Sequence, residues 1–150
     1  MKFLLLLSLL LCASSLPKYA PIIDKYSAEF NLDPIVLEAM IFVESSFRPH
    51  VPGIDADKKG WSYGLTQIKY STAKEMGFTG TLKQLEDPET NIHYGAMYLS
   101  WCRRFVGGDI WQALDAYNRG VGMVRKYPYK GKWKDHKHVG KVLKYIEGRT

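Results

Sequence analysis

The 150-residue sequence predicts a single, mainly α-helical domain built around a central apolar helix, with little or no β-sheet. Apolar residues recur at helical spacing in several segments, and proline, glycine or capping residues bound these segments. Segment 34–46 is apolar nearly all round, which is typical of a helix that other helices surround. No alternating run of apolar and polar residues is long enough for a substantial sheet.

Residues 1–15 differ in composition from the rest of the chain. Lys2 is followed by an apolar run over 3–11 and then by small residues. This is the pattern of a secretory signal peptide, and the run is too short for a stable membrane anchor. We therefore predict a signal peptide over 1–15, an exported domain over 16–150, and no stable membrane insertion after signal removal. The alternatives are a core helix or a lipid anchor on Cys12.

Loss of the signal peptide would leave a single cysteine, Cys102, on the apolar face of a predicted helix. A lone cysteine cannot form an internal disulfide, so packing must hold the domain together. No histidine and cysteine cluster has the spacing of a zinc site, and the histidines, His50, His93, His136 and His138, form no metal motif. We therefore expect no metal and no other cofactor.

The first two predicted helices are separated by a short turn. Residues 19–30 carry apolar and aromatic side chains at helical spacing. Asp33 then supplies an N-cap and Pro34 the first position of the apolar helix 34–46. Proline and glycine mark an irregular stretch that follows this helix and runs to about Ser62.

Two further helices are expected in the middle of the chain. A short one lies near 71–76, with Thr72 and Glu75 at the spacing of a capping box. A longer one opens with an aspartate and a proline and ends at a glycine pair, so that it occupies the segment 87–108.

The last third of the chain predicts two helices and a loop. Asp109 can cap a helix that closes around 118–120. Segment 121–136 mixes glycine, proline, tyrosine and lysine, and we interpret it as a loop. Apolar residues over 139–146 predict a final amphipathic helix.

The formal net charge is +6, and much of the excess lies near the end of the chain. A basic surface favours nucleic acid, anionic lipid or an anionic cell wall. For an exported chain the cell wall is the natural partner, and we expect no nucleic acid; the alternative is a solvated face without a specific partner. The basic residues are Arg125, Lys126, Lys130, Lys132, Lys134, Lys137, Lys141 and Lys144.

Glu44 is the first candidate for chemistry. It lies near the C-terminal end of the apolar helix, one turn from Met40 and Ile41. Desolvation by that surface and the negative end of the helix dipole both favour the protonated form of a carboxyl group. A carboxyl group that stays protonated near neutral pH can give a proton to a leaving oxygen. Glu38, on the same helix, is expected to be exposed or ion-paired.

Four short motifs, in a fixed order, accompany Glu44. They are ESSFRP at 44–49, SYGLTQI at 62–68, DPETNI at 87–92 with Gly95 and Tyr98-Leu99 beyond it, and AYNRG at 116–120. This ordered set resembles the soluble lytic transglycosylase (SLT) family, whose domains have a helical fold like that of goose-type lysozyme. The resemblance covers about residues 20–148, and it implies a lysozyme-like fold for this chain.

The resemblance also implies roles for individual residues. Glu44 matches the family's single catalytic glutamate, and Ser45 matches the next residue of the Glu-Ser motif, which helps to shape the site. Gln67 matches the glutamine of the Gly-Leu-Met-Gln-Ile segment, which lines the cleft. Tyr117 and Asn118 match the Ala-Tyr-Asn-x-Gly motif, whose tyrosine lies close to the glutamate and the sugar.

These residue types suit a sugar site, since a flat aromatic ring covers a sugar face and amides pair with N-acetyl and hydroxyl groups. Each motif also has a structural interpretation. Tyr117 can be a core aromatic residue with a satisfied hydroxyl group, and Gly64 can serve only a turn. For Asn91, Gly95 and Leu99 we prefer helix packing over a direct role.

The chain departs from the family pattern around the cleft. Thr66 stands where most members have methionine, which alters one wall of the cleft. Trp61 and Tyr63 replace the small residues that usually precede the Gly-Leu pair, and Tyr63 is a candidate substrate-binding residue. Arg48 takes a position that is more often asparagine.

A further departure lies near the C-terminus, where the family carries a tyrosine that faces the active site. Alignment of the segment 138–142 puts His138 at that tyrosine position. The role of the tyrosine is then vacant, or it is filled by His138, Tyr127 or Tyr129. His138 is therefore a candidate substrate-binding residue.

The resemblance implies a peptidoglycan lytic transglycosylase, which cuts the β-1,4 bond between N-acetylmuramic acid and N-acetylglucosamine and leaves 1,6-anhydro ends. Glu44 would protonate the glycosidic oxygen and then take the proton of the C6 hydroxyl group, while the substrate's acetamido group holds the charge on the sugar. Asp55 and Asp57 follow in the next loop, yet nothing fixes either as a nucleophile.

Three other functions are weighed against this one. The first is a lysozyme-type muramidase on the same fold, in which an aspartate of the loop 53–58 orients a water molecule. The second is a non-catalytic glycan-binding module, and the third is a basic nucleic-acid binder. In the favoured case the protein is a monomer in the periplasm or outside the cell, acting on glycan strands alone or with an envelope-spanning apparatus or a phage particle.

Overall fold

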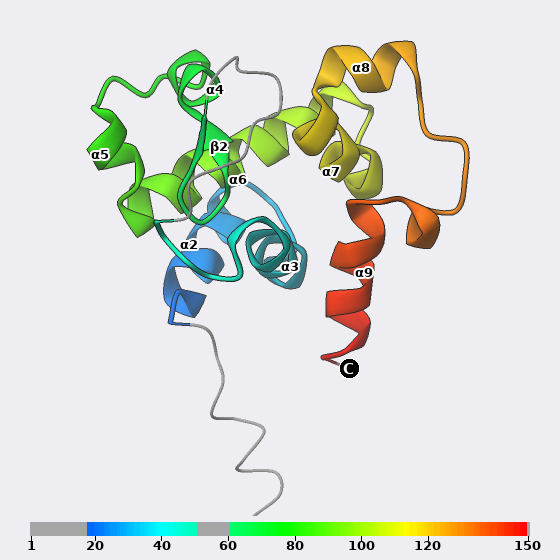
Figure 1. Ribbon diagram of the computed structural model, residues 1–150, viewed down its shortest axis with the longest axis horizontal. Helices are drawn as coiled ribbons and strands as arrows, with labels where there is room; N and C mark the ends of the chain where they lie inside the picture. Colours follow the sequence, from blue (N-terminus) through cyan, green and yellow to red (C-terminus); the bar gives the residue numbers. More distant parts are fainter. Residues whose placement is uncertain (1–17, 51–60, 150) are drawn as a thin grey trace, which may run out of the picture.

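The computed structural model describes residues 18–50 and 61–149 (Figure 1). Helices dominate these two ranges, and their one sheet has two strands of two residues each. The predicted mainly helical fold is therefore confirmed. The signal peptide predicted over 1–15 lies outside the described residues. None of the helices within them combines the length and the apolar character needed to cross a bilayer.

Helix α3, Pro34–Ser45, is the central apolar helix that the sequence predicts. It follows α2, Ala20–Glu29, and begins where the Asp33 carboxylate accepts a hydrogen bond of 3.0 Å from the Ile35 backbone N–H. Leu37, Met40 and Ile41 are fully buried. Because α2 packs on one side of α3 and α9, Val139–Glu147, on another, the apolar surface of α3 is enclosed.

The chain then forms a small subdomain of short elements. Strand β1, Ser62–Tyr63, pairs antiparallel with β2, Ile68–Lys69, and β2 runs directly into α4, Tyr70–Glu75. Helix α5, Leu82–Leu85, follows. A small apolar cluster holds these pieces together, formed by Ile68, Ala73, Phe78 and Leu85.

The capping box predicted at Thr72 and Glu75 is wrong. Because β2 leads straight into α4, the N-cap position falls on Lys69, and no side chain caps this helix. A reciprocal capping box occurs instead at α5. There the Thr81 N–H donates to Gln84 Oε1 at 2.8 Å, and the Gln84 N–H donates to Thr81 Oγ1 at 3.3 Å.

Two long helices, α6 and α7, complete the core. Helix α6, Pro88–Phe105, runs from the side of α5 to the side of α7, Ile110–Arg119 (Figure 1). The predicted caps are confirmed at both: Asp87 accepts from the Thr90 N–H at 3.0 Å, and Asp109 accepts from the Gln112 N–H at 2.7 Å.

The interpretation of 121–136 as a loop is wrong in two places. Helix α8, Val121–Lys126, begins immediately after α7, because Gly120 with φ +90° turns the chain between them. A 3₁₀ turn, η2, occupies Trp133–Asp135. Val124 is the one buried residue of α8, so this helix carries too little apolar periodicity to be recognised from sequence.

Asn91 connects the small subdomain to α6. Its fully buried side chain accepts hydrogen bonds of 2.8 Å from both the N–H and the hydroxyl group of Thr66. It also donates bonds of 2.9 Å to the carbonyl groups of Tyr63 and Leu85. A Cβ atom on Gly64 would lie 2.3 Å from the Asn91 amide nitrogen, and φ at Gly64 is +71°, so this turn requires glycine.

The same close packing explains Gly95 and Leu99, the other positions for which we predicted a packing role. A Cβ atom on Gly95 would lie 2.5 Å from the Thr66 side chain, so α6 and the hairpin loop are in direct contact there. Leu99 is fully buried in the main core. These contacts agree with a packing role for Asn91, Gly95 and Leu99.

We predict that Asn91→Ala lowers the free energy of unfolding by about 2–4 kcal/mol, because it leaves several buried polar groups without a partner. Urea denaturation measures this change. The control is Asn118→Ala, whose side chain is exposed and whose effect should stay within about 0.5 kcal/mol. Equal stability of the Asn91→Ala variant and the wild type would contradict the assigned role.

A second prediction concerns Cys102, which is fully buried and whose pKa is raised to about 12 by that burial. In a Cys12→Ser variant, where Cys102 is the remaining thiol, we expect no reaction with an aromatic disulfide reagent at about pH 8 in the native state. Reaction should become rapid in concentrated guanidinium chloride. Rapid labelling of the folded protein would show that this part of the core opens readily.

Candidate active site

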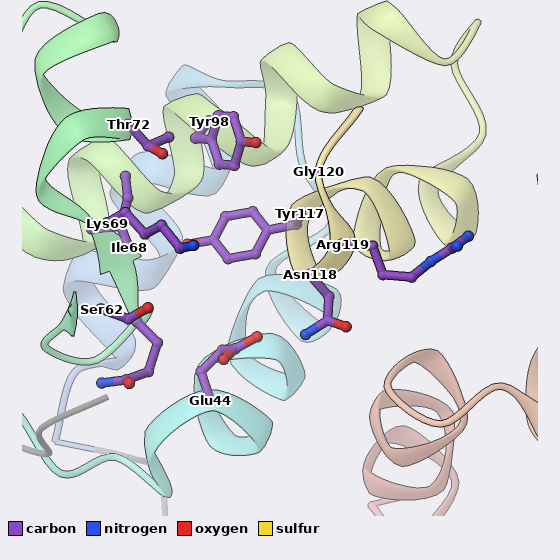
Figure 2. A pocket seen from close by; sticks show the side chains of 11 residues that line it. Glu44, Ser62, Ile68, Lys69, Thr72, Tyr98, Tyr117, Asn118, Arg119 and Gly120 are labelled. Atoms are coloured by element: carbon purple, nitrogen blue, oxygen red, sulfur yellow. The ribbon is translucent and has the colours of Figure 1, made fainter. Parts of the chain in front are cut away.

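A cleft of about 440 Å³ lies between the β-hairpin, the end of α3 and the end of α7 (Figure 2). Strand residues Ser62 and Ile68 form part of one wall, and Arg119 and Gly120 lie at the end of α7. Four of the predicted site residues line the cleft, and they are Glu44, Gln67, Tyr117 and Asn118.

Glu44 lies in the last turn of α3, which ends at Ser46 in a left-handed conformation. Figure 2 shows its carboxyl group pointing into the cleft, toward Asn118 and the ring of Tyr117. The side chain is 15% exposed, so the carboxyl group reaches the cavity while protein covers most of the glutamate. This placement agrees with the partial desolvation expected from the sequence.

Glu44 is the one carboxylic acid among the cleft-lining residues that the structure describes. Asp55 and Asp57, the candidates for a second carboxylate, lie outside the described residues. The other charged residues in the lining are the cations Lys69 and Arg119. No group of histidine, cysteine, aspartate and glutamate within 18–50 and 61–149 could hold a metal ion.

Glu38, the comparison residue on α3, has a different environment. Its carboxylate forms an ion pair with Arg149 and accepts a hydrogen bond of 2.7 Å from the Tyr145 hydroxyl group. It does not line the cleft. The sequence left exposure and ion pairing open for Glu38, and the structure assigns it to ion pairing.

Tyr117 both lines the cleft and joins its walls. Its hydroxyl group donates a hydrogen bond of 2.8 Å to the Thr66 carbonyl oxygen, and its ring lies 5.2 Å from that of Tyr98. Burial raises the pKa of Tyr117 well above its usual value, and the nearby Glu44 carboxylate adds to the effect. The phenol therefore stays protonated and holds α7 against the hairpin loop.

Gln67, from the hairpin loop, and Asn118, from α7, are the two residues with amide side chains in the described cleft lining. Gln67 has φ +49°, an uncommon conformation for a residue other than glycine and one that occurs at functional sites. Its side-chain amide donates a hydrogen bond of 3.0 Å to the Gly64 carbonyl oxygen. Asn118 is exposed on α7, and its amide points toward the cleft (Figure 2).

His138 reaches Glu44 without lining the cleft. Its Nε2 atom lies 2.7 Å from Glu44 Oε1, and the residue is 8% exposed at the N-cap of α9. The other two candidates for this position lie elsewhere: Tyr127 is 55% exposed, and the Tyr129 hydroxyl group donates to the Lys132 carbonyl oxygen. Of the three, His138 is the residue that the fold brings to Glu44.

Ser45 and Tyr63, the remaining predicted site residues, lie outside the cleft lining. Ser45 is buried, and its hydroxyl group donates to the Ile41 carbonyl oxygen at 3.1 Å, so it stabilises the end of α3. The Tyr63 carbonyl oxygen accepts from Asn91. Both residues shape the backbone on either side of the cleft.

A buried polar network behind the cleft was not predicted from the sequence. Asp115 is fully buried, accepts hydrogen bonds of 2.5 Å from Nε and Nη2 of Arg119, and lies 3.1 Å from His136 Nε2. The four-residue spacing of Asp115 and Arg119 on a predicted helix could have indicated this pair. The contact with His136 depends on tertiary structure and leaves no comparable pattern.

A second hollow of about 640 Å³ lies between α2, α6 and the segment 78–84. Aromatic rings of Tyr26, Phe78 and Tyr94 line it, beside the exposed ion pair of Lys25 and Glu89. It contains none of the predicted site residues, so the first cleft is the candidate active site.

Comparison with known proteins shows the family to which the chain belongs. Residues 21–139 match the family described as Transglycosylase SLT domain. The chain is 33% identical over 113 residues to membrane-bound lytic murein transglycosylase F of Pasteurella multocida, an alignment that covers 71% of this chain and 21% of that protein.

Solved structures show the same fold. The 70 kDa soluble lytic transglycosylase of Escherichia coli superposes with a TM-score of 0.72 at 25% identity, covering 87% of this chain and 24% of that one. An inactive mutant of the lytic transglycosylase Slt from Pseudomonas aeruginosa, in which a glutamate is replaced by glutamine, gives 0.65 at 26% identity, covering 88% and 22%. The chain thus spans less than a quarter of each relative.

The raised pKa of Tyr117 predicts a pH dependence of stability. Above about pH 10 an unfolded tyrosine ionises, whereas folded Tyr117 keeps its proton, so the native state binds more protons and the free energy of unfolding falls as pH rises. Tyr117→Phe should make this fall shallower, and Tyr127→Phe, at an exposed position, should not. Denaturation at several alkaline pH values tests the difference; equal slopes in all three proteins would contradict it.

Proposed function

Since the chain belongs to the transglycosylase SLT domain family, we propose that it is a peptidoglycan lytic transglycosylase with Glu44 as its single catalytic acid and base. One observation carries the proposal. A mostly covered carboxyl group points into a cleft whose walls bear the amides of Gln67 and Asn118 and the ring of Tyr117. Such a mixture of an acid, an aromatic ring and amides suits an N-acetylated sugar strand.

In the first step, protonated Glu44 gives its proton to the oxygen of the β-1,4 bond between N-acetylmuramic acid and N-acetylglucosamine. The bond to C1 of the muramic acid breaks, and the acetamido group of the same sugar stabilises the positive charge that develops there. A second carboxylate is not required for this step. Among the described residues that line the cleft, Glu44 is the group that can give this proton.

In the second step, ionised Glu44 takes the proton of the C6 hydroxyl group while that oxygen attacks C1. The product carries a 1,6-anhydro ring, no water is consumed, and Glu44 ends the cycle protonated. The hydroxyl group of Tyr117 is already bonded to Thr66, so its contribution is the position of the ring against the sugar.

A peptidoglycan substrate favours a location at the cell envelope. We infer that residues 1–15 direct export and that the exported domain acts as a monomer on glycan strands in the periplasm or at the wall. The relative from Pasteurella multocida is named a membrane-bound murein enzyme, which supports an envelope location. The basic residues toward the C-terminus suit an anionic polymer such as the wall.

Replacement of Glu44 tests the proposed chemistry directly. Glu44→Gln should lower the rate of muropeptide release from purified sacculi by at least about 100-fold, because the amide can neither give nor take the proton. The fold should be retained, as judged by circular dichroism. Glu38→Gln is the matched control on the same helix: its carboxylate lies outside the cleft, so activity per folded molecule should be kept.

Mass spectrometry of the released fragments identifies the reaction. We expect 1,6-anhydro ends. Reducing ends would instead identify a muramidase that admits water on the same fold, and intact sacculi with the wild-type protein would indicate a glycan-binding module.

A further inference from the structure

We propose that His138 is a positioning residue that holds Glu44 through a neutral Nε2–H group, and that His136 and Asp115 hold His138 in place. The inference rests on the proposed role of Glu44. It concerns three residues behind the cleft, none of which lines the cavity itself.

The contact between His138 and Glu44 is short and protected. Nε2 lies 2.7 Å from Oε1, the histidine side chain is 9% exposed, and the glutamate side chain is 15% exposed. The imidazole thus reaches the carboxyl group from the side of α9, and the cleft stays open for a ligand. The bond occupies one carboxyl oxygen and leaves the other to carry the catalytic proton.

The surroundings of the other ring nitrogen decide which tautomer is present. His138 Nδ1 is buried and has no hydrogen-bond partner among the described residues. A proton there would be an unpaired N–H donor inside the protein, an arrangement that is costly and rare. The proton therefore sits on Nε2, and the neutral ring donates a hydrogen bond to Glu44 Oε1.

A donor at this position has two effects on Glu44. It fixes the direction of the carboxyl group toward the cleft, and it stabilises the carboxylate that remains after the first proton transfer. Because Nε2 already carries its proton, His138 does not draw the catalytic proton away from Glu44. The histidine acts through the glutamate and need not touch the substrate.

His136 sets the position of His138. Its Nδ1 atom accepts hydrogen bonds from the backbone N–H groups of His138 at 3.3 Å and Val139 at 3.1 Å, at the start of α9. Since Nδ1 accepts, the proton of a neutral ring is on Nε2, which lies 3.1 Å from Asp115 Oδ1 and donates to it. The ring of His136 is thereby fixed at both ends.

Asp115 connects the two histidines, His136 and His138, to the helix that carries cleft residues. It is fully buried on α7, the helix of Tyr117 and Asn118, and its two oxygens also accept hydrogen bonds from Arg119. A buried carboxylate without these partners would be costly, so the set is mutually dependent. The end of α7 and the start of α9 are therefore joined by polar contacts beside Glu44.

Two substitutions of His138 separate the donor from the ring. His138→Phe keeps an aromatic ring but removes the N–H group, and it should lower kcat about 10- to 100-fold with KM nearly unchanged, as expected for a hydrogen bond to a charged group. His138→Gln, which restores a side-chain N–H donor, should be more active than His138→Phe. Wild-type kcat in His138→Phe, or equal rates in the two variants, would overturn the proposal.

A double-mutant cycle tests the role of His136. His136→Ala should lower kcat in the wild-type background but have little further effect in the His138→Phe background, because both changes remove the same contact. Additive effects would overturn the positioning role and assign His136 to stability alone. Thermal unfolding of each variant shows whether loss of folded protein contributes.

The tautomers can be measured without any assay of activity. In ¹⁵N-labelled wild-type protein near neutral pH, we expect the His138 ring to carry its proton on Nε2 and not on Nδ1, with the signal assigned by its loss in His138→Gln. A proton on Nδ1 would overturn the proposal. If Glu44→Gln proved fully active while this tautomer was observed, the proposed function would fail and the structural part of the inference would stand.

Discussion

The contact between Glu44 and His138 joins two residues that are 94 positions apart in the chain, and it depends on the packing of α9 against α3. At one end, His138 starts α9 beside the last turn of α3. At the other end, the Tyr145 hydroxyl group and the Arg149 guanidinium group bind Glu38 in the middle of α3. Two carboxylates of the same helix are thus held by the two ends of α9.

Apolar packing supplies the force that brings these helices together. Leu37, Met40 and Ile41 of α3 and Val139 and Val142 of α9 have no exposed surface. Removal of such side chains from water is worth about 1.5–3 kcal/mol each, so the position of α9 is set by the core and adjusted by polar contacts. Glu44, the proposed catalytic acid, is therefore positioned by the same interactions that stabilise the domain.

The opposite wall of the cleft is held by a chain of polar contacts. Asn91 on α6 fixes the backbone and hydroxyl group of Thr66, and the Thr66 carbonyl oxygen accepts from Tyr117 on α7. The Thr66 side chain packs within 2.5 Å of the position that a Cβ atom on Gly95 would take. Its hydroxyl group thus adds a polar link between the hairpin loop and α6, and its side chain fills the space beside Gly95.

Local chemistry explains why much of the fold could be predicted from the sequence. Asp33, Asp87 and Asp109 cap helices through backbone groups two or three residues away, and such signals are complete within a few positions. The capping box predicted at Thr72 is absent because β2 of the hairpin runs directly into α4 and sets the start of that helix. Helix α8 was not predicted because it buries too little apolar surface to produce a periodic pattern in the sequence.

The same distinction applies to the candidate site: residues of sequence motifs could be predicted, and contacts between distant elements could not. Glu44, Gln67, Tyr117 and Asn118 belong to ordered motifs, and the structure brings all four to one cleft. The partnership of His138 with Glu44, and of His136 with Asp115, depends on how α7 and α9 meet. Histidine spacing alone carries no information on that geometry.

The most direct measurement is a crystal structure of the Glu44→Gln variant with a peptidoglycan glycan strand bound. We expect the strand to lie in the cleft between Gln67 and Tyr117, with a glycosidic oxygen within hydrogen-bonding distance of the side chain at position 44. A strand that instead occupied the hollow of Tyr26, Phe78 and Tyr94, with position 44 remote from every glycosidic oxygen, would contradict it.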